Sequence, residues 1–133
     1  MALAPWGVLG GGRLRTDAEE ERRRQTGEKG RTLISSDWER TPEEKKVCAA
    51  LEKVAKEVGT EHITAVAIAF VMQKTPYVFP IIGGRKIEQL MANIEALKIS
   101  LTEEHIKNLD SVSSLDPGFP YNYIVSRGLF FTS

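Results

Sequence analysis

The segment YVFPIIGGRKIEQLMAN, residues 77–93, places a short apolar run directly before two glycines and a helical pattern. Residues 77–82 show no polar alternation, which is typical of a strand covered on both faces in a parallel sheet. Pro80 removes one backbone donor, so we expect it at an edge or an irregularity of that strand. An apolar stripe at helical spacing follows, formed by Ile87, Leu90, Met91, Ile94 and Leu97.

Helix signals occupy both sides of this unit. Thr41 and Glu44 predict a capping box, with Pro42 at the first helical position and Gly59 at the end. A second helix, apolar nearly all round, should begin between residues 60 and 64. Thr102 predicts the cap of a last helix.

The stretch from residue 13 to residue 40 is charged and shows little periodicity, so we expect a long loop that carries one short polar helix at 17–25. Its three glutamates and three arginines, residues 19–24, should form ion pairs at helical spacing on a solvated face. The apolar start, residues 3–9, supplies the other expected strand. An α/β protein with parallel strands is therefore predicted, yet two strands make too small a sheet, so the chain looks like a piece of a larger fold.

Bulk properties exclude several classes of function. The chain has 133 residues, the size of one small domain, and its 18 Lys plus Arg balance 18 Asp plus Glu. This balance argues against nucleic acid or an anionic membrane as a partner. The apolar start is too short and too interrupted for a membrane span, and we expect no signal peptide. A single cysteine, Cys48, fits a reducing compartment, so a cytoplasmic location is expected.

The glycine turn is a candidate anion site. A strand that opens directly into a helix leaves backbone N–H groups at the helix start for a ligand. Gly83 and Gly84 permit close approach and positive φ, whereas Arg85 offers a bidentate fork and Lys86 a mobile charge. An ordinary turn with two solvated cations explains the same residues equally well, since short glycine turns are common.

Gln89 and Asn93 favour the ligand interpretation. They follow Arg85 at steps of four residues, so all three should share one helix face that is free to meet a ligand. Their amides offer a donor and an acceptor together, which suits the edge of an adenine ring.

These residues resemble a known family. The pattern Gly83, Arg85, Gln89 and Asn93 after an apolar strand is similar to the NADP-binding end of the aldo-keto reductases. Three further segments resemble that family and occur in the right order: LAPWGVLGGGR (3–13), TAVAIAFVMQK (64–74) and DPGFP (116–120). Together with the glycine turn, they are most similar to the fungal aryl-alcohol dehydrogenase and norsolorinic-acid-reductase-like branch of the family.

The resemblance implies a fold and a site. Residues 1–122 are expected to be the C-terminal part of a TIM (β/α)8 barrel, namely its last two βα units plus an extra helix, and 123–133 form an unassigned tail. Four residues would hold the 2′-phosphate and ribose of NADP: Gly83, Gly84, Arg85 and Lys86. Gln89 and Asn93 would contact phosphate and adenine. Three residues would reach the pyrophosphate and nicotinamide: Ala4, Pro5 and Trp6.

The resemblance also implies what is missing. The catalytic Asp, Tyr, Lys and His of the family belong to the first half of the barrel, which lies outside this chain, so no catalytic residue is assigned. We expect no metal site, because His62, His105 and Cys48 do not share ligand spacing.

The expected function is therefore part of an NADP-dependent reductase of aldehydes or ketones, inactive alone, whose full-length relatives take NADP(H) and a small carbonyl or alcohol substrate. The alternative is a non-catalytic nucleotide-binding or interaction fragment, either associating with an intact relative or representing a truncated gene product.

Overall fold

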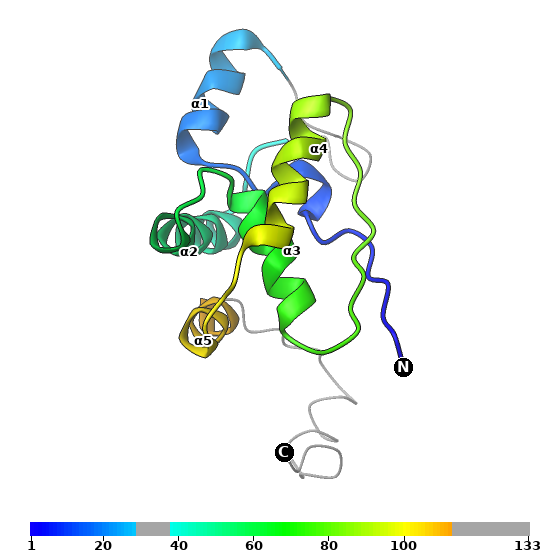
Figure 1. Cartoon of the computed structure of the whole chain (residues 1–133). Coiled ribbons are helices and arrows are strands. Elements are labelled where there is room, and N and C mark those ends of the chain that lie inside the picture. Colours follow the sequence, from blue (N-terminus) through cyan, green and yellow to red (C-terminus); the bar gives the residue numbers. More distant parts are fainter. Residues whose placement is uncertain (29–37, 113–133) are drawn as a thin grey trace, which may run out of the picture.

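The computed structural model describes residues 1–28 and 38–112, and most of these lie in helices. The predicted tail and the DPGFP segment lie outside the described residues, as does part of the charged loop. The elements follow in this order (Figure 1): a 3-10 helix η1 (Gly10–Gly12), α1 (Asp17–Thr26), α2 (Pro42–Val58), α3 (Ile63–Gln73), α4 (Ile87–Ile94), a 3-10 helix η2 (Glu95–Lys98) and α5 (Glu103–Val112).

The two expected strands pair in parallel, but only through isolated bridges. Leu3 bridges Val78 and Trp6 bridges Ile81. The Leu3 carbonyl accepts from the Phe79 N–H at 2.7 Å, and the Pro5 carbonyl accepts from the Ile81 N–H at 2.9 Å. The parallel direction is thus confirmed, whereas continuous strands are absent from the described residues. Pro80 has no N–H to donate, and each segment has only one neighbour, so the pairing stays short.

The core lies where α3 meets its neighbours. α3 is buried on most sides, as its apolar sequence predicted, and it packs against α2, α4 and η2. α2 contributes Cys48, Leu51, Val54 and Ala55 to this core, and α5 contributes Leu109. Cys48 is fully buried and forms no disulfide, so it acts as a small packing residue of this core.

Helix ends agree closely with their sequence signals. The Thr41 hydroxyl accepts from the Glu44 N–H at 3.2 Å, and the Glu44 carboxylate accepts from the Thr41 N–H at 2.8 Å. Gly59 closes α2 in the left-handed region at φ 79°. The Thr102 hydroxyl accepts from the His105 N–H at 3.2 Å, so the predicted cap of α5 is confirmed as well.

The charged stretch folds back on itself around a buried carboxylate. Glu20 on α1 accepts hydrogen bonds from Arg40 Nε at 2.8 Å and from Arg15 Nε at 3.1 Å, and all three side chains are buried. The Arg15 guanidinium also lies over the Trp38 ring, 5.2 Å from its centre. The helix and its ion pairs at helical spacing are confirmed, but the expectation of a wholly solvated face was wrong. We call Arg15, Glu20 and Arg40 the ion cluster.

Helix α4 presents its apolar stripe to solvent. Exposure of the five stripe residues runs from 41% at Ile94 to 77% at Ile87. The helix instead buries Asn93, and η2 buries Ala96. Among the described residues, no element buries the stripe, although Ile94 and Leu97 at its end line a cavity together with residues of α3.

Candidate functional site

The glycine turn lies exposed at the amino-terminal end of α4. Gly83, Gly84, Arg85 and Lys86 are all exposed, and α4 begins at the next residue. Trp6 bridges Ile81, so Ala4, Pro5 and Trp6 run alongside the residues just before the turn. Ala4 and Trp6 are exposed and Pro5 is half-buried. The fold therefore brings the two predicted parts of the site, residues 4–6 and residues 83–86, to the same end of the paired segments.

Gln89 turns back to cap its own helix. Its side-chain oxygen accepts from the Arg85 N–H at 2.9 Å and from the Lys86 N–H at 3.3 Å. The cap therefore engages the Gln89 acceptor, and the contact of Gln89 with a ligand stays a prediction. Two backbone donors that the sequence offered to an anion are engaged in the same way.

Gly84 is required by this cap rather than by backbone conformation. Neither Gly83 nor Gly84 adopts a positive φ. A Cβ on residue 84 would lie 3.1 Å from Gln89 Oε1 and 3.2 Å from Gln89 Cβ, whereas a Cβ on residue 83 would meet nothing within 4 Å. The glycine lets the Gln89 side chain come close to the turn.

Asn93 is buried, whereas Arg85 and Gln89 are exposed. It is only 5% exposed and lines a half-open cavity of about 240 Å³ between α4, α3 and residues 79–82. Helical spacing failed here because Arg85 precedes the first helical residue, so a step of four does not set its direction. The apolar lining is formed by Ile68, Met72, Phe79, Pro80, Ile82, Ile94, Ala96 and Leu97.

The two cations of the turn differ in their surroundings. Lys86 Nζ lies 3.8 Å from the Glu28 carboxylate, just after the end of α1. Within the described residues, no ion pair engages the Arg85 guanidinium. In Figure 1 the end of α1 and the start of α4 lie at the same end of the molecule. Across residues 1–28 and 38–112, the turn therefore holds one cation without an ion pair, Arg85, and one cation, Lys86, that is shared with a carboxylate.

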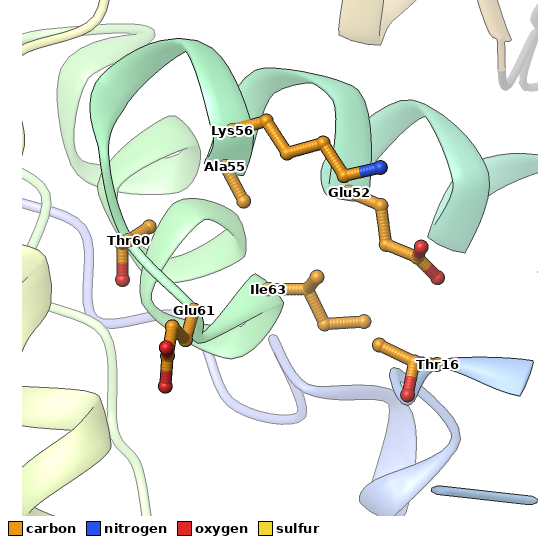
Figure 2. A pocket seen from close by; sticks show the side chains of 7 residues that line it. All are labelled: Thr16, Glu52, Ala55, Lys56, Thr60, Glu61 and Ile63. Carbon is orange, nitrogen blue, oxygen red and sulfur yellow. The ribbon is translucent and has the colours of Figure 1, made fainter. Parts of the chain in front are cut away.

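A second cavity, of about 250 Å³, contains none of the predicted site residues. Its lining includes Glu52 and Lys56 on α2, Thr16 before α1 and Ile63 at the start of α3 (Figure 2). Its residues offer neither a nucleophile beside a base nor a cluster of cations for a phosphate.

The two histidines in the described residues do not form a catalytic or metal-binding group. His105 Nε2 lies 2.9 Å from Glu57, and His62 Nε2 lies 3.7 Å from Glu95, so each histidine has a structural partner. No group of three or more potential ligands in the described part of the chain could hold a metal ion. A search of the same residues finds no helix with the length and apolar character to cross a membrane.

Comparison with known proteins identifies the family. The model of the aldo/keto reductase family matches residues 1–114. The chain belongs to the aldo/keto reductase family. An aryl-alcohol dehydrogenase of Phanerodontia chrysosporium, whose name specifies NADP(+), is 59% identical over 122 residues, which are 91% of this chain and 32% of that protein.

Two shorter relatives come from Saccharomyces cerevisiae. The putative aryl-alcohol dehydrogenase YFL057C is 53% identical over 93% of this chain and 81% of its own length. The putative aryl-alcohol dehydrogenase AAD15 is 49% identical over 97% of this chain and 90% of its own length. This aldo/keto reductase chain thus spans about a third of the Phanerodontia relative and most of the two yeast proteins.

Sequence reasoning missed Glu28 as a neighbour of the site. Glu28 and Lys86 are far apart in the chain and share no periodic pattern. The tertiary fold brings them together, and no local signal in the sequence encodes that contact.

Proposed function

We propose that this chain is part of an NADP-dependent aldo-keto reductase and that its glycine turn binds the 2′-phosphate and ribose of NADP. The observation that carries this proposal is the Arg85 guanidinium beside Lys86 at the amino-terminal end of α4, which forms no ion pair with the residues that the structure describes. Ala4, Pro5 and Trp6, at the same edge, would line the path toward the pyrophosphate and nicotinamide. Under this proposal residues 1–122 are the C-terminal part of a (β/α)8 barrel in a cytoplasmic enzyme.

The chemistry of the turn suits a phosphate monoester. A guanidinium binds a phosphate through two parallel hydrogen bonds, which a hydroxyl group cannot reproduce. Lys86 would exchange the Glu28 carboxylate for a phosphate, which carries more negative charge and more acceptor oxygens. The site therefore favours NADP over NAD. Gln89 would support the site by holding the backbone of the turn in place. Asn93 would support it through its packing in the cavity beneath α4.

Hydride transfer is assigned to groups outside this chain. When bound, the nicotinamide cofactor supplies the hydride that reduces a carbonyl substrate. This chain would hold the adenosine end of that cofactor, and the aldehyde or ketone would bind elsewhere in the full-length protein. We propose that the 133-residue chain by itself gives no NADPH-dependent reduction of an aromatic aldehyde, and a steady loss of NADPH absorbance would contradict this.

Titration calorimetry tests the cofactor proposal directly. We expect NADPH to bind the full chain more tightly than NADH, and Arg85→Ala to weaken NADPH binding roughly 10-fold or more, as for loss of a charge-assisted hydrogen bond. Arg22→Ala, on the exposed surface of α1, is the matched control and should leave binding unchanged. Equal binding of NADPH and NADH would refute the proposed role of Arg85.

A further inference from the structure

One face of the molecule is apolar and continuous over two elements. The α4 stripe is exposed along its whole length, and Phe79 and Ile81 of the bridged segment are 61% and 55% exposed. Phe79 lines the cavity beneath α4 together with Ile94 and Leu97 of the stripe, so the helix and the segment form one surface. A soluble protein rarely leaves such a surface uncovered unless a partner binds there.

The backbone beside this face is also incomplete. The bridged segments satisfy each other along one edge, through the Leu3, Pro5, Phe79 and Ile81 groups. Within the described part of the chain, no further strand pairs with the two outer edges of this parallel pair. Parallel strands are found in larger sheets that are covered on both faces, and two strands do not suffice. The missing partner must therefore supply strands as well as apolar side chains.

We infer that this face binds a polypeptide of the aldo/keto reductase family that lacks its own copy of the present segment. The length of the Phanerodontia relative supports this occupant, because the matched segment makes up only 32% of that protein. In the Phanerodontia protein, the rest of the chain, outside the matched 32%, would supply the residues that pack against the matched segment. This inference does not depend on cofactor binding by the glycine turn.

Two other occupants fit the face less well. An intact relative already holds its own copy of the segment, 59% identical in the Phanerodontia protein, so the corresponding face is filled. A second copy of this chain could cover the α4 stripe with its own stripe, but it would leave sheet edges open on both copies.

Co-expression tests the inference. The tagged partner is the Phanerodontia polypeptide without the matched segment, produced together with the full 133-residue chain. We expect both chains in the soluble fraction as a one-to-one complex, and no complex with the intact Phanerodontia protein. Leu90→Glu combined with Leu97→Glu, at side chains already exposed to solvent, should reduce recovery of the complex at least 10-fold.

A control variant on α5 tests whether the effect is specific to the stripe. Val112→Glu alters an exposed apolar residue on α5, away from the stripe, and should leave the complex intact. A partner that stays insoluble beside the present chain, or a complex that the stripe variant does not weaken, overturns the inference. A homodimer that the stripe variant dissociates assigns the face to a second copy instead.

Discussion

Glu20 is a carboxylate enclosed by cations. Besides its hydrogen bonds to Arg40 and Arg15, its other oxygen lies 3.7 Å from both Arg24 and Lys45. Burial alone raises the pKa of Glu20, but the hydrogen bonds from Arg40 and Arg15 outweigh it and lower the pKa from 4.5 to about 2. The ion cluster is therefore held together by one negative charge at its centre.

Acid should release the charged stretch from the helices. Because the pKa of Glu20 is lower in the folded chain, its stabilising contribution is complete above pH 4.5 and is lost as the pH falls toward 2. Glu20→Gln leaves the buried Arg15 guanidinium without a carboxylate partner among the described residues and leaves Arg40 paired with Asp17 alone, at a cost of roughly 3 kcal/mol. Hydrogen exchange of the α1 amides should rise in this variant at pH 7 and respond less to acid.

Glu21→Gln is the control for this prediction. Glu21 occupies the same helix, but its side chain is 55% exposed and pairs with Arg24 at the surface. Such a pair contributes about 0.5 kcal/mol at most. Equal exchange rates in the two variants would mean that the ion cluster does not hold α1.

Glu28 should compete with phosphate for Lys86. The pair is half-exposed and 3.8 Å long, so its loss costs little stability. Under the proposed function, Glu28→Gln should tighten NADPH binding a few-fold and leave NADH binding unchanged, as measured by calorimetry. Glu43→Gln, an exposed carboxylate in the first turn of α2, should change neither. A weaker NADPH complex in the Glu28 variant would show that the carboxylate helps to bind the cofactor.

At the scale of elements, the start of α4 depends on a side chain that returns to the turn. Gly84→Ala should push the Gln89 side chain away, since the new Cβ would come within 3.1 to 3.2 Å of it. The amides of Arg85 and Lys86 would lose their acceptor, and hydrogen exchange at both should increase several-fold. Gly83→Ala is a closely matched control, because the added Cβ meets nothing within 4 Å. If both variants exchange alike, Gln89 does not cap the helix in solution.

The helices were predictable because their signals are local. Thr41, Glu44 and Gly59 encode the two ends of α2 within one turn of each end, and these signals act in any tertiary context. The exposed turn before α4 was predictable for the same reason. Asn93 was not, because its direction depends on where α4 starts and on packing against α3. The ion cluster joins Glu20 to Arg40, 20 positions apart, and no periodic pattern in the sequence predicts such a contact.

The short pairing of the bridged segments was not predicted either, because it too depends on tertiary neighbours. Residues 77–82 have the composition of a strand, and their parallel direction was predicted correctly. Strand length, however, depends on neighbours on both sides, and the described residues supply only one.

At the scale of the whole molecule, the exposed apolar face should govern behaviour in solution. The α4 stripe, Trp6 and the bridged segment together expose a large area that water solvates poorly. We expect the isolated chain to bind the dye ANS, to associate as its concentration rises and to unfold over a broad temperature range. A sharp cooperative melt from a monodisperse monomer would contradict this expectation.

The ion cluster also bears on the connectivity of the chain. It joins residues on either side of the stretch between Gly27 and Trp38: Glu20 is held by Arg40, and Arg15 by the Trp38 ring. Arg13 adds a contact to Glu44, and Arg24 adds one to Glu39. Proteolytic cleavage at a single site in that stretch should therefore leave two fragments that stay associated through these noncovalent contacts. We expect α1 to stay bound to α2 through these side-chain contacts after such a cut.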